Sequence, residues 1–326
     1  MEKKLRIVFM GTPDFAVSSL KRLLETEHPV VGVITAPDKP AGRGKKIISP
    51  PVKQFADAND ISPVLQPANL KDPEFITQLQ SLRADLQIVV AFRMLPEIVW
   101  AMPPKGTVNL HASLLPDYRG AAPINWAIIN GEKETGVTTF FIEKEMDTGK
   151  IILNSRVAIG PEMSAGELHD VLKNEGAELV VKTLKAISDN RYTTMSQNKL
   201  IKDKELHPAP KIFKEDCRIN WKQSSETIYN FIRGLSPYPA AWTELEKDGK
   251  ILSLKIFKAA MGNESFTENQ PDVQTDGKTY FEISTADGYL SILELQQAGK
   301  KKMSVGDFLR GVMEPENYTI KLDGAV

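Results

Sequence analysis

The sequence predicts an α/β fold in two domains. Dense apolar runs at residues 5–10 and 86–92 are typical of parallel strands that are buried on both faces. A segment with helical spacing separates the first run from Val30–Ile34, which gives a β-α-β unit. Short alternating segments between residues 241 and 295 instead predict a small barrel. We therefore expect a Rossmann-like, doubly wound N-terminal domain followed by a β-barrel domain.

Local signals place the other elements of the first domain. Thr12 is predicted to cap the first helix and Pro13 to be its first residue. Only one glycine precedes this helix, whereas the dinucleotide-binding motif needs three, so nucleotide binding of that type is not expected. A long helix is predicted from Ser164, where Glu167 completes a capping box. Shorter helices are predicted at residues 51–58, 72–82, 95–101 and 121–130, and strands at 64–65, 108–111, 136–142 and 150–157.

Composition limits the class of protein. The chain has 326 residues, 41% of them hydrophobic, which is enough to bury a sizeable core. It has no apolar run of transmembrane length and no signal-peptide pattern, and its single cysteine excludes an internal disulfide and a Cys-based zinc site. We expect a cytoplasmic monomer that does not associate with membranes. The net charge of −1 means that any nucleic-acid binding would depend on local patches.

The loss of apolar periodicity after residue 188 marks the predicted domain boundary. Residues 189–210 are rich in lysine, asparagine and proline, which is typical of a linker. The expected division is a catalytic domain at residues 1–188, a linker at 189–210 and a barrel domain at 211–326. The cluster at residues 300–302 is either a solvated turn or a nucleic-acid contact.

Asn109 and His111 are the first candidates for chemistry. They lie two apart in a short strand, so they share a face, and they precede a loop punctuated by Pro116, Gly120 and Pro123. Open α/β sheets place their chemistry where strands end. The alternative for an isolated pair of this kind is the solvated face of an edge strand.

The wider motif resembles that of a known family. Residues 109–123, Asn-Leu-His-Ala-Ser-Leu-Leu-Pro-Asp-Tyr-Arg-Gly-Ala-Ala-Pro, are followed by Glu-Met-Asp-Thr-Gly at 145–149. Together they resemble the 10-formyltetrahydrofolate-dependent formyltransferases. Segments 7–16, 40–46 and 218–221 extend the resemblance to the methionyl-tRNA formyltransferases over nearly the whole chain. The resemblance implies transfer of the formyl group of 10-formyltetrahydrofolate to the methionine amine of initiator Met-tRNA, with no metal, and an OB-like C-terminal barrel that binds tRNA.

The resemblance also implies roles for individual residues. Asn109 would donate to the formyl oxygen. His111 would either donate to that oxygen as a cation or accept the amine proton as a neutral base, and Asp147 would orient the imidazole. The family usually has Tyr-Gly where this chain has Phe92-Arg93, which alters the expected lining of the folate pocket. The loop expected to bind the folate consists of Ser113, Leu114, Leu115 and Pro116.

Residues 37–47 contain two glycines, two prolines and four cations, which predicts a basic loop. On composition alone it is either an ordinary solvated loop or a binding element. The resemblance implies that it enters the acceptor-stem end of the tRNA. Arg43 would then contact the terminal base pair, and Lys45 and Lys46 would contact phosphates.

Two alternatives remain. A folate-dependent formyltransferase that acts on a small amine, such as glycinamide ribonucleotide or an amino-sugar nucleotide, would share Asn109, His111 and Asp147 but is not expected to combine the basic loop with a C-terminal barrel. A folate- or RNA-binding module without catalysis would not need those three residues.

Overall fold

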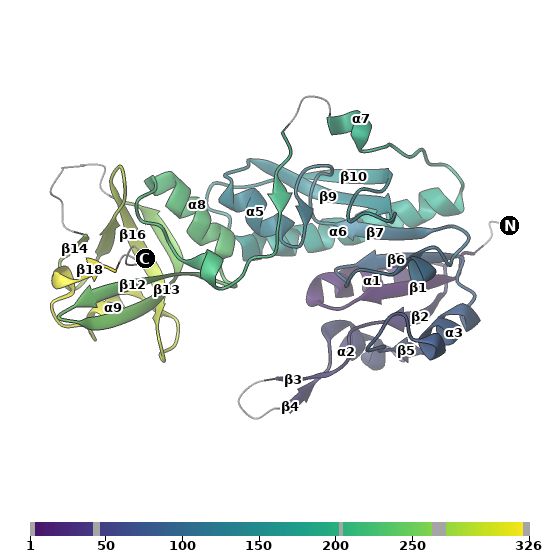
Figure 1. Ribbon diagram of the computed structural model, residues 1–326, viewed down its shortest axis with the longest axis horizontal. Coiled ribbons are helices and arrows are strands. Elements are labelled where there is room, and N and C mark those ends of the chain that lie inside the picture. The colour runs from purple at the N-terminus through teal and green to yellow at the C-terminus, as the bar shows by residue number, and fades with distance from the viewer. Residues whose placement is uncertain (1–3, 42–45, 202–204, 263–271, 322–326) are drawn as a thin grey trace. The chain divides into compact units, whose positions relative to one another are not determined.

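The structure is a computed structural model that describes residues 4–41, 46–201, 205–262 and 272–321 (Figure 1). The chain divides into two compact units. The first comprises residues 1–123, 134–158 and 169–209, and the second comprises residues 124–133, 159–168 and 210–326.

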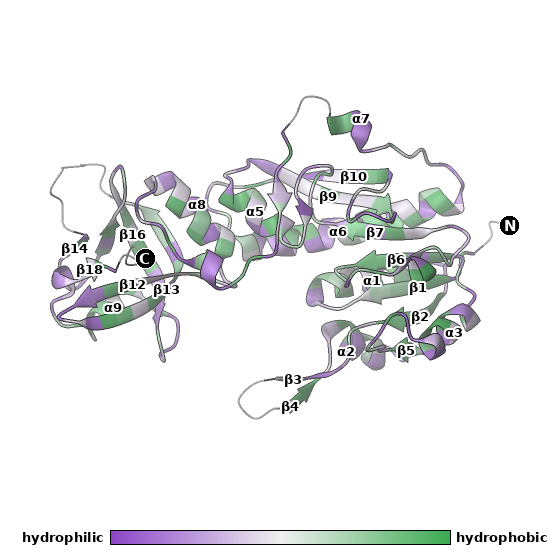
Figure 2. Ribbon diagram, in the orientation of Figure 1, coloured by the Kyte–Doolittle hydropathy of each residue, from purple (hydrophilic) through white to green (hydrophobic). Residues whose placement is uncertain are grey.

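The first unit is built on a seven-stranded sheet with the order β10-β9-β7-β6-β1-β2-β5. Strands β5, β2, β1, β6 and β7 run parallel, whereas β9 is antiparallel to both β7 and β10. Apolar residues run through β1 and β6 (Figure 2), and both strands are wholly buried, which confirms the α/β prediction. The strands are β1 (Ile7–Gly11), β2 (Val30–Ile34), β5 (Val64–Leu65), β6 (Leu86–Val90), β7 (Thr107–His111), β9 (Glu134–Phe141) and β10 (Ile151–Ala158).

One helix start differs from its prediction. Pro13, not Thr12, occupies the N-cap position, in an extended conformation and without a side-chain hydrogen bond, and the helix begins at Asp14. By contrast, the Asp72 side chain accepts a hydrogen bond from the N–H of Glu74 at 2.9 Å and caps the third helix, at the start of the helix predicted for residues 72–82. The helices are α1 (Asp14–Leu24), α2 (Pro51–Ala58), α3 (Pro73–Ser81), α4 (Glu97–Trp100), α6 (Ala165–Ser188) and α7 (Asn198–Ile201).

Helix α6 covers one face of β7. A Cβ at Gly176 would meet the Leu110 side chain, and the hydroxyls of Thr139 and Thr183 lie 2.8 Å apart, which joins β9 to the same helix. Because side chains alternate along a strand, Asn109 and His111 lie on the face of β7 opposite to α6.

The basic loop at residues 37–47 is more regular than predicted. Strands β3 (Lys39–Ala41) and β4 (Lys46–Ile48) flank its centre and pair antiparallel. The prediction of a loop throughout is therefore wrong at both ends, because three-residue strands carry too little periodicity to be recognised in a sequence.

The second unit contains an antiparallel sheet with the order β14-β15-β16-β13-β12-β18, and β17 also pairs with β16. The Asp272 carboxylate, next to β14, accepts a hydrogen bond from the N–H of Ile320 in β18 at 2.7 Å. This bond brings the two edges together, so the sheet forms a nearly closed barrel, as predicted. Its elements are α5 (Pro123–Ile129), α8 (Ser225–Leu235), β12 (Ala241–Lys247), β13 (Lys250–Met261), β14 (Val273–Thr275), β15 (Phe281–Ser284), β16 (Tyr289–Gln297), β17 (Met303–Ser304), α9 (Val305–Leu309) and β18 (Thr319–Ile320).

Within the described residues, no helix combines the length and the hydrophobicity that a membrane span requires.

Candidate active site

Asn109 and His111 lie on a central strand of the sheet. Strand β7 pairs with β6 on one side and with β9 on the other, so it is not an edge strand with a solvated face. The His111 residue is only 6% exposed. The Asn109 side chain is partly buried, and no described residue is a hydrogen-bond partner of its amide. The amide is therefore free to donate to a ligand.

The contacts of His111 determine where its protons lie. Its Nε2 is 2.8 Å from the carbonyl oxygen of Tyr118. Because a carbonyl oxygen only accepts, Nε2 must carry a proton. Nδ1 is 3.8 Å from Oδ2 of Asp147, which is longer than a direct hydrogen bond. In the neutral ring, Nδ1 is then the atom that can accept a proton, and the resulting cation would face the carboxylate.

Asp147 is held in an uncommon backbone conformation. Its φ of 55° lies in the left-handed region, which aspartate tolerates better than most residues. Its Oδ2 accepts a hydrogen bond from the N–H of Gly120 at 3.1 Å, and its side chain is 12% exposed. Gly149, two residues later, lies so close to the carbonyl of Phe141 that any side chain would collide with it. The turn between β9 and β10 thus aims the carboxylate at the imidazole.

The predicted folate loop is a tightly packed turn. The Ser113 hydroxyl donates to the carbonyl of Asp117 at 2.6 Å, and the N–H of Leu115 donates to the hydroxyl of Thr138 at 3.2 Å. Leu115 is 4% exposed and packs in a core cluster. The Ser113 and Leu115 side chains therefore face protein, while Leu114 and Pro116 are only partly buried.

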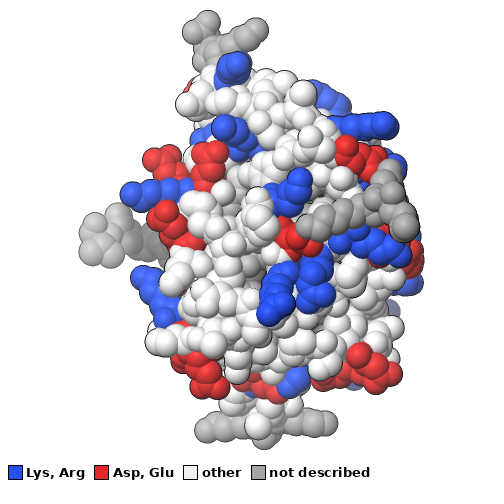
Figure 3. Space-filling model, turned by 90° about the vertical axis from the view of Figure 1, so that its right-hand side faces the viewer, with Lys and Arg blue, Asp and Glu red and all other residues white. Residues whose placement is uncertain are grey.

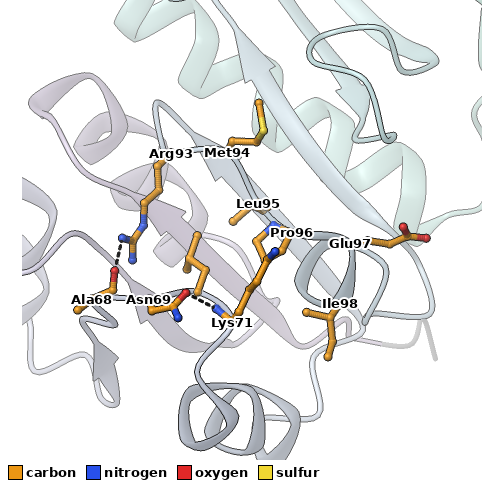
Figure 4. Close-up of a pocket in the computed structure, with 10 residues that line it drawn as sticks. Ala68, Asn69, Lys71, Arg93, Met94, Leu95, Pro96, Glu97 and Ile98 are labelled. Atoms are coloured by element: carbon orange, nitrogen blue, oxygen red, sulfur yellow. Dashed lines mark hydrogen bonds between the residues drawn. The ribbon is translucent and has the colours of Figure 1, made fainter.

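A cavity of about 710 Å³ opens at the carboxyl ends of β5 and β6 (Figure 4). Because β7 lies beside β6 and runs parallel to it, His111 ends at the same edge of the sheet. The Arg93 guanidinium donates to the carbonyls of Ala68, at 2.9 Å, and of Pro67, so it ties the two walls together. Partial burial lowers the pKa of Arg93 from its usual value. The cavity is lined by Ala68, Asn69, Leu70, Lys71, Arg93, Met94, Leu95, Pro96, Glu97 and Ile98.

The structure describes only part of the segment that is predicted to contact tRNA. Arg43 and Lys45 lie outside the described residues, and Lys46 is the first residue of β4, with a side chain that is also outside them. On the face of the molecule in Figure 3, cationic and anionic side chains are interspersed, in keeping with the net charge of −1. In the part of the chain that is described, no three His, Cys, Asp or Glu side chains are grouped so as to hold a metal ion.

Comparison with protein families decides the family. A model described as "Formyl transferase" matches residues 5–184, and one described as "Formyl transferase, C-terminal domain" matches residues 211–313. The chain belongs to the formyl transferase family. The family expected from the sequence motifs is thereby confirmed.

Formyl transferases of similar sequence align with this chain over nearly its full length. A methionyl-tRNA formyltransferase of Phocaeicola vulgatus is 56% identical over 98% of this chain and 100% of its own length. One from Parabacteroides distasonis is 53% identical over 98% of this chain and 99% of its own length.

Solved structures of other proteins share the fold. HypX from Aquifex aeolicus in complex with tetrahydrofolic acid is 20% identical, with a TM-score of 0.62, over 95% of this chain and 48% of its own. An N-formyltransferase from Helicobacter canadensis in complex with folinic acid and dTDP-3-aminofucose is 23% identical, with a TM-score of 0.61, over 92% of this chain and 100% of its own.

Sequence reasoning missed one part of this formyl transferase's site. Residues 195–201 and 205–209 lie between the two family matches and were expected to be linker, yet they bond to the loop that follows His111 and to the Asp147 turn. The N–H of Tyr118 donates to the carbonyl of His207 at 2.8 Å. Strand β8 (Arg119–Gly120) pairs in parallel with β11 (Pro208–Ala209). These partners are about ninety residues apart in sequence, and two-residue strands leave no periodicity that could have revealed them.

Proposed function

We propose that this formyl transferase transfers the formyl group of 10-formyltetrahydrofolate to the amino group of methionine on initiator Met-tRNA, for translation initiation. The observation that carries the proposal is the convergence of Asn109, His111 and Asp147 at the carboxyl edge of the sheet. The end-to-end similarity to methionyl-tRNA formyltransferases supports the choice of acceptor.

Formyl transfer places three demands on the protein. An unprotonated amine attacks the formyl carbon and negative charge develops on the formyl oxygen. The bond from that carbon to the folate nitrogen then breaks, and a proton must pass from the attacking amine to the departing folate nitrogen. Asn109 meets the second demand, because its amide has no described partner and can donate to the oxygen. A donor that is aimed at developing charge is typically worth about 10²–10³ in rate.

His111 and Asp147 meet the demand for proton transfer. The Nε2–H of His111 is engaged by Tyr118, so a proton is gained or lost at Nδ1. Asp147 lies on that side and stabilises the cationic ring. The separation of 3.8 Å fits a site without substrate, since catalytic hydrogen bonds often tighten only when the reactants bind.

The cavity at Arg93 would supply space for the folate, because it opens at the edge of the sheet where β7 and His111 also end. Its apolar wall, which includes Met94 and Leu95, suits an aromatic ring system, and the cations Lys71 and Arg93 suit the carboxylates of a glutamate tail. The loop formed by Ser113, Leu114, Leu115 and Pro116 would bound the folate on the β7 side. Leu114 and Pro116 are its more accessible side chains.

The tRNA would be bound by both domains. We assign Arg43 to the terminal base pair and Lys45 and Lys46 to phosphates. A planar guanidinium can pair with the edge of a base, whereas an ammonium is a point charge that suits a phosphate. The barrel of the domain at residues 211–326 would contribute further binding, as barrels of this kind bind oligonucleotides in other proteins. We expect residues 1–188 to supply the catalytic side chains, and residues 189–210 to lead to the barrel while also bonding to the loop after His111. We expect a cytoplasmic monomer.

A formylation assay tests the proposal. The purified full-length protein is given 10-formyltetrahydrofolate with initiator Met-tRNA, free methionine, glycinamide ribonucleotide or a dTDP-amino sugar, and Asn109→Ala serves as the inactive control. We expect formylation of Met-tRNA alone. Preferred formylation of a small amine would overturn the choice of acceptor, and formylation of none would leave a binding module.

A further inference from the structure

The side-chain amide of Gln197 is fully used inside the first unit. Gln197 lies just before α7, in the segment between the two family matches, and is only 1% exposed. Its Nε2 donates to the carbonyl of Asp147 and to the carbonyl of Gly149, both at 2.8 Å. Its Oε1 accepts from Nε and Nη2 of Arg119, at 3.0 and 2.6 Å. One amide thus holds the backbone of the Asp147 turn and a cation from the opposite loop.

These bonds close a ring around the carboxylate. Arg119 precedes Gly120, whose N–H donates to Oδ2 of Asp147. The carbonyl of Asp147 accepts a hydrogen bond from Gln197, and the side-chain oxygen of Gln197 accepts one from Arg119, which closes the ring. Carboxylate and backbone of Asp147 are therefore held from two directions by elements that are themselves joined.

The ring of hydrogen bonds surrounds a residue with an unfavourable backbone conformation. A left-handed conformation costs a residue other than glycine roughly 1–2 kcal/mol, so Asp147 needs neighbours that hold it there. Gln197 is anchored by its own segment, because Met195 forms a two-bond antiparallel bridge with Ile151 at the start of β10. Nothing about the position of Gln197 in the sequence indicates this role.

We infer that Gln197, together with Arg119, is a positioning residue that sets the placement of the Asp147 carboxylate against His111. The inference rests on the proposed function for its kinetic consequence, although the arrangement itself does not. Loss of the Gln197 amide should let the turn relax and move the carboxylate away from Nδ1, and misplacement of a catalytic group by about 1 Å can cost roughly 10²-fold in rate.

Gln197→Met tests the inference, because methionine has a similar length but makes none of the four bonds. We expect kcat for Met-tRNA formylation to fall about 10²-fold with little change in the KM for formyl-folate. In an Asp147→Asn background, the same change should cost less than about 3-fold, because residues that act as a unit are not additive. Additive losses would overturn the inference.

The matched control is Gln87→Met. Gln87 is fully buried at the amino end of β6, where it accepts from the Thr107 hydroxyl, far along the sheet from the carboxyl edge. The Gln87→Met substitution should lower the free energy of unfolding but leave kcat within about 2-fold of the parent. In the Asp147→Asn background its effect on kcat should be the same as in the parent.

A readout without substrate separates this inference from the proposed function. The ¹⁵N resonances of the His111 ring report the group that faces Nδ1. They should move in the same direction in Gln197→Met and Asp147→Asn and stay in place in Gln87→Met. Unmoved resonances would overturn the inference, whereas moved resonances in a protein that does not formylate Met-tRNA would overturn only the proposed function. If Gln197→Met does not fold, Arg119→Met removes the partner of Oε1 at a half-buried position, and we expect a smaller shift of the same sign.

Discussion

Asp147 and Gly120 are joined by a hydrogen bond of 3.1 Å from the N–H of Gly120 to Oδ2 of the carboxylate. The same oxygen is the one that lies 3.8 Å from Nδ1 of His111. Gly120 has a φ of 128°, and a side chain there would strike the carbonyl of Ala209. The carboxylate is therefore held by a backbone that only glycine can adopt, independently of the histidine that it serves.

Asp147→Asn should remove most activity while preserving the fold. The amide oxygen of asparagine can still accept from Gly120, but a neutral group cannot stabilise an imidazolium. We expect kcat to fall roughly 10²–10⁴-fold, the range of general acid–base contributions. The pH–rate profile should change as well. Full activity with an unchanged profile would remove Asp147 from the mechanism.

Asn109→Ala should lower kcat by about 10²–10³-fold at almost no cost in stability. The reason is that its amide bonds to no described residue, so truncation leaves no partner unsatisfied. His111→Ala provides the contrast. It should lose activity similarly and also remove the hydrogen bond from His111 to the Tyr118 carbonyl, which is worth about 0.5–1.5 kcal/mol of unfolding free energy. Initial rates of the two variants test the expected loss of activity, and thermal unfolding tests the expected difference in stability.

Arg93→Met should weaken folate binding rather than slow the chemistry. The side chain closes the cavity through the carbonyls of Pro67 and Ala68 and supplies positive charge to it. We expect the KM for formyl-folate to rise about 10-fold, equivalent to roughly 1.4 kcal/mol, with kcat little changed. The preference for polyglutamyl over monoglutamyl folate should shrink. Ile98→Ala, on the same cavity wall, is a control without charge, and it should leave that preference intact.

The capping box at the start of α6 gives a pH-dependent prediction. The Ser164 N–H and hydroxyl both donate to the Glu167 carboxylate, at 2.8 and 2.7 Å, and they lower its pKa from the ordinary value of 4.5. A lowered pKa in the folded state contributes stability that is present above pH 4.5 and is lost as the pH falls through the folded value. Ser164→Ala should cost about 0.5–2 kcal/mol at neutral pH. Denaturant titrations should show that the difference from the parent narrows in acid, and a difference independent of pH would contradict this origin.

The fold was predictable wherever the signal is local and periodic. The apolar run at β1, the capping box at Ser164 and the alternating strands of the barrel follow from neighbouring residues, and each is present. The pairing of Asn109 and His111 on one face needed only the two-residue period of a strand. The link from Asp147 to that face came from family resemblance, because a carboxylate on a hairpin turn carries no signal of its own.

The rest depended on contacts between distant segments. Gln197 lies 50 residues from Asp147 and 78 from Arg119, so no local pattern could show that it joins them. Leu115 belongs to a motif expected to bind folate, yet its side chain packs in the core, because a motif records which residues are needed without saying which of them touch the ligand. Thr12 has the chemistry of a cap, but the chain reaches α1 through an extended Pro13 instead.

The centre of the basic loop at residues 37–47 is flanked by strands β3 and β4, which pair antiparallel. Arg43 lies between two glycines, so the backbone on either side can adopt conformations closed to other residues. Its guanidinium offers a planar fork for base edges. Arg43→Ala should therefore weaken the discrimination between initiator and elongator Met-tRNA by about 1–3 kcal/mol.

Lys46→Ala is the matched control, because a phosphate contact carries no sequence information. It should weaken formylation of both tRNAs alike and reduce the salt dependence of KM by about one phosphate contact. Formylation efficiency on both tRNAs at two salt concentrations separates the cases. If Arg43→Ala lowers the formylation efficiency on both tRNAs equally, the loop is a charge patch and the discrimination arises elsewhere. If all the changes are silent, the loop is simply solvated, and the assignment of Arg43 to the terminal base pair fails.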